Sequence, residues 1–344
     1  MFLMRRIVAL LFIICFFQTC CSYASNIEVI PTTQTYSSNQ NRVWSGVFQL
    51  AWNDLYNING NRVIFAGKTP DVVNQLNNRE FSYLSMPKKD YYAIASKIKH
   101  STKRGIQHNI KKRLNIKSDL IKQARFVPQN DRIVLYGALN KDINFVTMFD
   151  NLGTAKFGEN QTANYFGVNN QTKSNYSDTV HVLFYKSPHD FAISLNTQGD
   201  DVIYLYKTSD NVTFQETYKE MLFKAERYYG DGKLSEIDTL MIPYIQFKAE
   251  QNFTDLENRL IYKASMKINS AMETIIFDMS NKGLEAQPDY QKVNMKKALE
   301  VCEVEPRKFL LDDTFVIFVR GKSLDKPYFA LRVNDITQFQ VPNL

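Results

Sequence analysis

Apolar residues recur at helical spacing through the first third of the chain. The spacing of Val47, Leu50 and Leu55 predicts a helix over Trp44–Tyr56. Two more ranges, 69–82 and 88–123, have the same kind of pattern, the second with a strongly basic face. The sequence therefore predicts that the first third is rich in helices.

The pattern changes near Phe126, where short apolar runs separated by short polar turns become the rule. This arrangement is typical of antiparallel strands. The runs that predict strands are Arg132–Leu139, Val180–Tyr185, Phe191–Leu195, Val202–Tyr206, Ile242–Lys248 and Thr274–Met279. Thr213–Tyr228 and Leu256–Lys263 predict helices. Helices first and strands later, without regular βαβ alternation, indicate the α+β class.

The end of the chain predicts a long exposed loop held between strands. Thr314–Val319 and Tyr328–Val333 alternate like strands, and the short turn Gly321–Lys326 makes them antiparallel neighbours. The polar range Gly283–Pro306 precedes them and predicts an exposed loop that is the first site of limited proteolysis. Long loops in compact domains are usually functional.

The order and spacing of these segments resemble the C-terminal third of serpins. Ile242–Lys248 resembles the family's strand that begins with an apolar residue and a proline, here Pro243. Phe145 and Phe149 have the spacing of the tryptophan and phenylalanine that follow the family's central strand, although tryptophan is absent here. The chain is similar to a remote or degenerate member. The resemblance implies a three-sheet domain with an exposed loop that serves as protease bait.

The resemblance also implies a hinge at the start of this loop, formed by Gly283, Leu284, Glu285 and Ala286. In serpins that trap proteases, the cleaved arm inserts into the main sheet as a new strand. Side chains from 284 to 290 alternate as a strand requires, but Leu284 stands where a small hydroxyl residue normally enters first. Pro288 cannot donate a ladder hydrogen bond. Trapping of a protease and simple cleavage by it are both open alternatives.

The family's usual loop length, counted from Gly283, places the scissile bond at Lys297–Ala298. Lys296 and Lys297 would then suit a trypsin-like protease, whose specificity pocket carries a carboxylate. The resemblance therefore implies an inhibitor of a serine-type endopeptidase. One alternative is a non-inhibitory binding protein of the same fold, and another is a surface protein of unrelated α+β fold.

The chain begins like an exported protein. Arg5 and Arg6 precede the apolar run Ile7–Phe17, and small residues end at Ala24, so 1–24 predicts a signal peptide. Residues 25–43 predict a polar linker and 44–344 a single domain, which we expect to be monomeric and secreted or periplasmic. Three of the four cysteines lie in the leader, which leaves Cys302 without an intramolecular partner. No later segment predicts a membrane span.

The net charge of +7 is concentrated in residues 97–125, which contain one acidic residue, Asp119. A solvated helix face explains this composition, and a polyanion site is the alternative. In an exported protein a polyanion would be an acidic glycan before a nucleic acid. The candidate residues are Lys103, Arg104, Lys111, Lys112 and Arg113.

Catalytic and metal-binding motifs are absent from the sequence. The four histidines are scattered, and no phosphate-binding glycine loop, nucleophile elbow or paired-histidine zinc motif occurs. We therefore expect no enzyme activity, no cofactor and no metal site.

Overall fold

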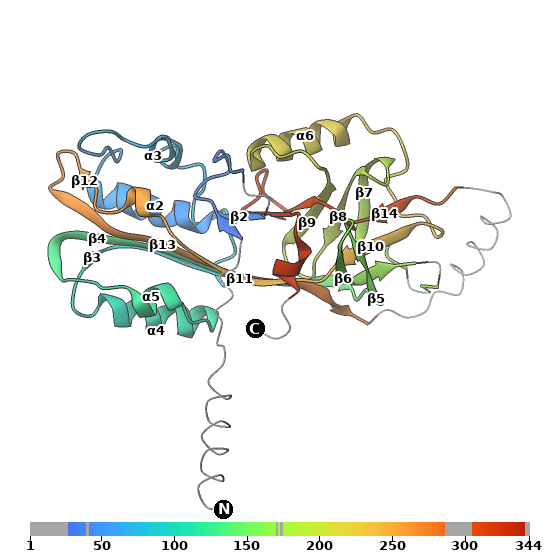
Figure 1. Ribbon diagram of the computed structural model, residues 1–344, viewed down its shortest axis with the longest axis horizontal. Helices are drawn as coiled ribbons and strands as arrows, with labels where there is room; N and C mark the ends of the chain where they lie inside the picture. The colour runs from blue at the N-terminus through green and yellow to red at the C-terminus, as the bar shows by residue number, and fades with distance from the viewer. Residues whose placement is uncertain (1–26, 39–40, 170, 173–174, 286–304, 341–344) are drawn as a thin grey trace, which may run out of the picture.

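The computed structural model describes residues 27–38, 41–169, 171–172, 175–285 and 305–340, which form three β-sheets with helices packed on them (Figure 1). The largest sheet has the strand order β1 (Glu28–Val29), β2 (Arg42–Ser45), β16 (Phe329–Val333), β15 (Phe315–Gly321), β9 (Asp201–Lys207), β8 (Asp190–Asn196), β7 (Val180–Ser187). A second sheet contains β11 (Ile245–Asn252), β13 (Met266–Leu284), β4 (Gln129–Thr147) and β3 (Tyr91–Ile98), with β12 (Leu260–Ile261) paired to β13. The third contains β14 (Lys308–Leu310), β10 (Thr239–Pro243), β6 (Gln161–Val168) and β5 (Asp150–Phe157).

The helices cover both faces of the sheet that contains β13. In Figure 1, α2 (Val47–Asn59) and α3 (Asp71–Leu76) lie above this sheet, and α4 (Thr102–Leu114) and α5 (Asp119–Gln123) lie below it. The other half of the molecule is rich in strands and carries α6 (Phe214–Glu226). Two short 3₁₀ turns, η2 (Thr254–Leu256) and η3 (Ile336–Phe339), complete the described secondary structure.

The two longest strands, β4 and β13, form a parallel pair at the centre of their sheet. Each has 19 residues, and the pairing runs from Lys267 opposite Arg132 to Leu284 opposite Thr147. We call this pair of strands the central seam. Parallel strands cannot be joined by a tight turn, and the chain between them passes through the other two sheets and then through β11 and β12.

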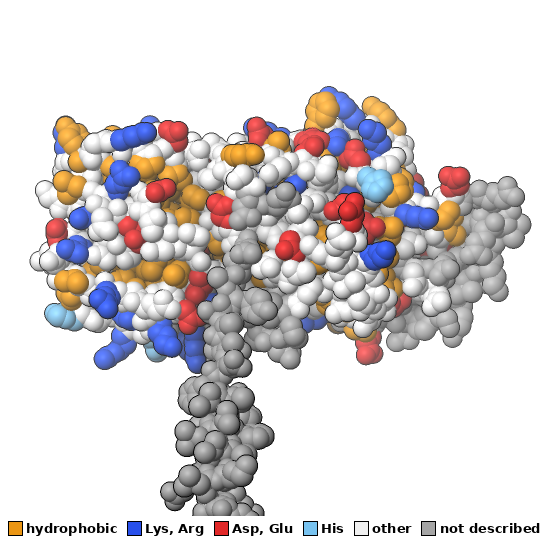
Figure 2. Space-filling view, viewed as in Figure 1, with side chains coloured by type: hydrophobic (Ala, Val, Ile, Leu, Met, Phe, Trp, Pro, Cys, Tyr) orange, Lys and Arg blue, Asp and Glu red, His pale blue; other side chains and the backbone are white. Residues whose placement is uncertain are grey.

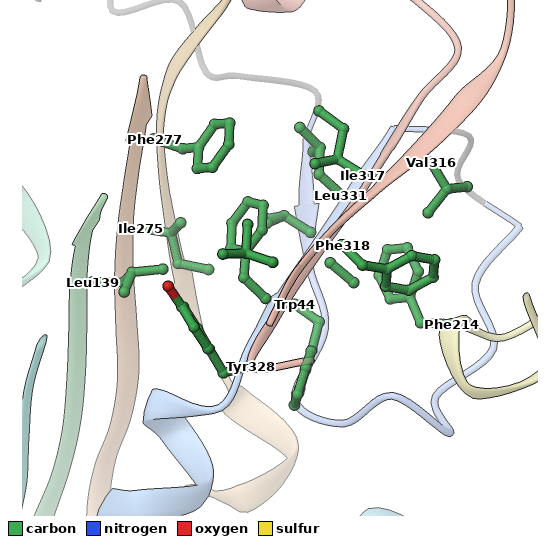
Figure 3. Packing of buried hydrophobic residues seen from close by; sticks show 14 of the residues in the cluster. Trp44, Leu139, Phe214, Ile275, Phe277, Val316, Ile317, Phe318, Tyr328 and Leu331 are labelled. Atoms are coloured by element: carbon green, nitrogen blue, oxygen red, sulfur yellow. The ribbon is translucent and has the colours of Figure 1, made fainter. Parts of the chain in front are cut away.

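The core lies where the sheet that contains β15 packs against the sheet that contains β13. Figure 3 shows Ile275 and Phe277 of β13 facing Ile317 and Leu331 of the other sheet. Phe277 stacks on Phe329 with ring centroids 4.6 Å apart. A second cluster of buried residues joins α4 and α5 to the opposite face of the sheet. The central seam is therefore buried on both faces.

The α+β prediction is confirmed, as is the prediction of three sheets with two antiparallel neighbours near the C-terminus. Phe315 pairs with Val333 and Val319 with Phe329 in antiparallel register. The three antiparallel strands expected between Val180 and Tyr206 are confirmed as β7, β8 and β9. The helix expected over Thr213–Tyr228 is confirmed as α6.

The helix expected over 88–123 was wrong in its first part, where β3 occupies Tyr91–Ile98. This strand is packed between α2 and α4, and both of its faces carry apolar residues, so it lacks the period of two that marks a half-exposed strand. The helix expected over Leu256–Lys263 was also wrong, because that range holds η2 and β12. Ile242–Lys248 covers parts of two strands, β10 and β11, which break at Tyr244.

Part of the range expected as a polar linker packs against the domain. Within 25–43, the residues that the structure describes include β1 and the beginning of β2, and Val29 and Val43 are buried. Val29 and Val43 are directly paired in a parallel register. The sequence missed this pairing because β1 has only two residues, too few for a periodic pattern.

Candidate functional site at the ends of β13 and β14

The candidate site is the connection from β13 to β14. Gly283 and Leu284, expected as the start of an exposed loop, are the last residues of β13. The Leu284 side chain is 62% exposed, and Glu285 follows it as an exposed residue. The remaining residues of the predicted site lie outside the described residues: Ala286, Lys296, Lys297 and Ala298.

The end of β13 is attached by backbone hydrogen bonds to the segment that links β4 to β5. The amide of Met148 donates to the carbonyl of Leu284 over 2.8 Å, and the amide of Phe149 donates to the carbonyl of Asn281 over 3.2 Å. The side-chain amide of Asn281 donates back to the carbonyl of Phe149 over 3.1 Å. The first two residues of the predicted hinge, Gly283 and Leu284, are therefore part of the sheet and are not free.

Gly283 is required by this close approach of two backbones. A side-chain carbon at position 283 would lie 2.4 Å from the Met148 nitrogen and 2.6 Å from the Thr147 carbonyl carbon. Distances this short are not tolerated, and backbone atoms cannot rotate out of the way. Any other residue here would push β13 away from the end of β4.

An exposed ion-pair network surrounds the end of β13. The Lys282 ammonium lies 2.9 Å from Asp142 of β4 and 3.0 Å from Asp278 of β13. Its side chain is 43% exposed, so solvent weakens both attractions. This network adds little to the attachment that the backbone makes.

The other end of the connection is held by a side chain, Arg307, directly before β14. Its guanidinium Nη2 lies 2.8 Å from the Asp238 carboxylate, whose side chain is only 2% exposed. The Arg307 amide donates to the same carboxylate over 2.8 Å. Burial opposes the charge on Arg307, but the hydrogen bonds and charge attraction of Asp238 outweigh it, so the pKa of Arg307 is raised.

Sequence reasoning missed both attachments. Arg307 and Asp238 are separated by 69 positions, and neither belongs to a recognisable motif. Gly283 was identified as a hinge residue by resemblance, but its contact with Met148 depends on the path of the chain after β4.

The five candidate residues for polyanion binding lie on α4, which Figure 2 shows at the lower edge among other Lys and Arg side chains. Lys103 has a structural role, because its ammonium group donates hydrogen bonds to the backbone carbonyls of Lys122 and Ala124. Arg113 donates to a backbone carbonyl at Lys88. Arg104, Lys111 and Lys112 are exposed residues.

Ion pairs do not neutralise this face within the described part of the chain. Of the acidic residues near α4 and α5, Asp119 is paired with Lys248 at 2.9 Å. That interaction, first through its hydrogen bond, lowers the pKa of Asp119. The exposed cations of α4 therefore keep their charge available to a ligand.

A hollow of about 480 Å³ lies beside the end of β13. Its lining includes Tyr244, Gln246, Asp278 and Gln340. If the chain is a non-inhibitory binding protein that holds its ligand in a cavity, this hollow is a candidate for that cavity. In the parts of the chain that the structure describes, no three His, Cys, Asp or Glu side chains are grouped as a metal site would require, and no helix has the length and apolar character to cross a bilayer.

No protein-family model matches the sequence, and no curated protein matches it. Solved structures do. A serpin from Anopheles gambiae has a TM-score of 0.54 at 9% identity, covering 88% of this chain and 94% of its own. The chain has the serpin fold.

Two further serpin-fold structures have similar scores. Mouse protein-Z dependent protease inhibitor has a TM-score of 0.53 at 10% identity and covers 85% of this chain and 90% of its own. Thyroxine-binding globulin, solved in complex with thyroxine, has a TM-score of 0.53 at 12% identity, with 86% and 93% covered. The same fold thus occurs in a protease inhibitor and in a thyroxine-binding protein, and it does not decide between these functions.

Proposed function

We propose that this chain is an exported serpin-fold inhibitor of a trypsin-like serine endopeptidase and that the protease cleaves the connection between β13 and β14. The observation that supports the proposal is the position of this connection in the serpin fold. It leaves a long strand of the central seam, returns at β14, and contains Lys296 and Lys297. No catalytic constellation within the described residues competes with this interpretation.

The proposed reaction starts at the Lys297–Ala298 bond. The protease serine attacks the carbonyl carbon of Lys297, the bond to the Ala298 nitrogen breaks, and a proton moves to the departing amine. Trapping requires that the arm ending in Lys297 enters the sheet before water hydrolyses the acyl-enzyme. The arm must separate β4 from β13, which are paired along their length, and release the Gly283 attachment.

Incubation with trypsin tests the proposal. A trap yields a covalent complex that survives SDS, and a substrate yields only cleaved chain. Lys297→Ala should abolish the complex or move cleavage to Lys296, whereas Lys292→Ala, a lysine in the same connection, should leave it unchanged. Equal effects of both changes would contradict the assigned bond. First cleavage elsewhere, with 283–306 intact, would contradict the inhibitor proposal.

The thermal midpoint shows whether the arm inserts after cleavage. Insertion adds a central strand, so cleavage should raise the midpoint sharply; without insertion the midpoint should stay unchanged. If Leu284 and Pro288 block entry, Leu284→Thr combined with Pro288→Ala should restore part of the rise. Proline removes one ladder hydrogen bond, a loss of about 1 kcal/mol.

A second candidate function is the binding of an acidic glycan by the exposed cations of α4. The observation that favours it is that Arg104, Lys111 and Lys112 are exposed and form no ion pair with a described residue, although Lys111 donates to the side chain of Asn115. Exposed, unpaired cations on one helix face attract a polyanion at long range. This function is compatible with the fold whether or not the connection traps a protease.

Retention on immobilised heparin tests this candidate. Added salt should lower retention, because screening weakens exposed charge contacts. Replacing Lys111, Lys112 and Arg113 by alanine should lower it well beyond the effect of a control with the same charge loss, for which the exposed residues are Lys186, Lys219 and Lys233. Equal losses of retention in the two variants would show that the cations of α4 face solvent and do not form a specific glycan site.

A further inference from the structure

Two consecutive residues in the middle of β13 carry buried polar side chains. Glu273 and Thr274 both have no exposed surface. Neighbouring residues of a strand point to opposite faces, so one side chain contacts the helices above the sheet and the other those below. The middle of the central seam is therefore held by polar contacts on both faces.

The contacts of Thr274 cross the central seam on the α5 face. The Tyr136 hydroxyl, from β4, donates to Thr274 Oγ1 over 3.0 Å. Thr274 Oγ1 also lies 3.0 Å from the hydroxyl of Ser118, the residue that caps α5, and 3.0 Å from Glu250 of β11. Separating β4 from β13 would break the bond between Tyr136 and Thr274.

Glu273 makes the corresponding contact on the α2 face. Its Oε1 accepts a hydrogen bond from the hydroxyl of Ser45, which precedes α2. Its Oε2 is buried and has no hydrogen-bond partner among the described residues. Gly137 lies opposite Glu273 in β4, and a side-chain carbon there would approach the Phe48 nitrogen to 3.3 Å. The seam, the start of α2 and the carboxyl group thus meet at one point.

No ion pair among the described residues involves Glu273. Of the charged side chains on neighbouring elements, Arg42 of β2 bonds Asn211, Lys141 of β4 pairs with Asp90 and Asp201, and Lys248 of β11 pairs with Asp119 and Glu250, while Asp54 of α2 accepts from Tyr83. Burial raises the pKa of Glu273 to about 8, although the hydrogen bond from Ser45 and the nearby backbone amide of Phe48 favour the ionised form.

We propose that Glu273 is a proton-controlled latch on the central seam, which holds β4, β13 and α2 together while its carboxyl group is neutral and loosens them when it ionises. An ionised carboxylate without a cation in this buried position is costly, and separation of the strands admits water to it. If the protein traps proteases, the latch sets the pH range in which the arm enters. The latch itself rests on Glu273 and its neighbours and not on the cleaved connection.

The sign of the effect follows from the raised pKa. The folded protein keeps the proton on Glu273 up to about pH 8, whereas the unfolded chain releases it near 4.5. The stabilising contribution of the neutral carboxyl group is complete below the pKa of Glu273 in the unfolded chain. It is lost as pH rises toward the pKa of Glu273 in the folded protein. Over this window, the ratio of folded to unfolded protein should fall up to about tenfold per pH unit from this group.

Two measurements between pH 5 and 9 test the latch. Urea unfolding reports the stability of the whole fold. Hydrogen exchange of the β4 and β13 amides, corrected for the intrinsic exchange rate at each pH, reports the opening of the central seam. In the unaltered chain, stability falls across the window and exchange at the seam rises at least about tenfold from pH 6 to pH 9. Glu273→Gln, which cannot ionise, should remove both effects. The same slope in this variant would overturn the proposal, as would a slope without any change in seam exchange.

Two other variants keep the test decisive if Glu273→Gln folds poorly. Ser45→Ala removes a bond that favours the ionised form, so the window should extend to higher pH. Glu257→Gln is the matched control: burial raises the pKa of that half-buried carboxyl also, but it accepts from the backbone amide of Ala271 and makes no hydrogen bond with Ser45 of β2, so seam exchange should keep its pH dependence. Loss of that dependence in the control would contradict the assignment to Glu273.

Discussion

The two ends of the connection between β13 and β14 are attached by different kinds of interaction. At the N-terminal end, Leu284 is held by backbone pairing, with Gly283 allowing the close approach. At the C-terminal end, Arg307 is held by a nearly buried ion pair with Asp238. The first attachment can be exchanged for another strand pairing, since backbone groups find equivalent partners in any sheet. The second depends on one specific pair of side chains.

This difference gives the connection a direction. After cleavage, the N-terminal arm can leave its place one hydrogen bond at a time, whereas release of Arg307 would leave the buried Asp238 carboxylate without a counter-charge. Any rearrangement should therefore start at β13, and β14 should keep its place. Three substitutions test this comparison.

The largest effect is expected at the C-terminal end. Arg307→Ala removes the partner of a carboxylate that is 2% exposed, and losing one member of such a pair costs about 3 kcal/mol or more. Urea unfolding measures the loss. Combining Arg307→Ala with Asp238→Asn removes the unpaired charge, so the double variant should be more stable than Arg307→Ala alone. A double variant that is less stable would show that the pair is not what holds this end.

A smaller effect is expected at the N-terminal end. Gly283→Ala places a carbon where the backbone of Met148 already lies, so β13 must shift, at a cost of about 1–3 kcal/mol. Proteolysis after Glu285 should become faster, because the end of β13 loosens. Gly105→Ala, in an open position of α4, is the control and should not destabilise the protein. Similar losses in both variants would contradict the close-approach argument.

The smallest effect is expected for the ion pairs beside the hinge. Lys282→Ala removes contacts with Asp142 and Asp278, but all three side chains are partly exposed, so the loss of stability should be about 0.5 kcal/mol or less. Thermal unfolding at low and at high salt measures it, and the difference from the unaltered chain should shrink as salt rises. A loss as large as that of Gly283→Ala would make charge the main attachment at this end.

Much of the fold could be predicted from the sequence, because local patterns carry it. The meander of β7, β8 and β9 has short turns and clear apolar runs, and β15 and β16 are joined by one short turn. The strand β3 could not be predicted, because helices bury both of its faces and remove the period of two. The antiparallel pair of β5 and β6 was missed as well, because polar residues occupy much of both strands.

The sequence predicts a long loop between two strands, most of which lies outside the described residues, but it does not predict how the two ends of the connection are attached. A long polar segment between strands marks a connection in the sequence, because loops expose their backbone to water. What holds each end depends on residues that are far apart in the chain, since Gly283 meets Met148 and Arg307 meets Asp238. No spacing rule links such pairs.

The sequence by itself determined the class of the fold and the order of its strands near the C-terminus. Only the tertiary structure decided that Gly283 and Leu284 are paired into the sheet and that Glu273 is buried without an ion pair to any described residue. The physical reason is that periodicity records which side of one element faces the core, whereas a pKa or a close backbone contact depends on which other elements arrive there. An isolated glutamate in a strand looks like any exposed one until the sheet and α2 close over it.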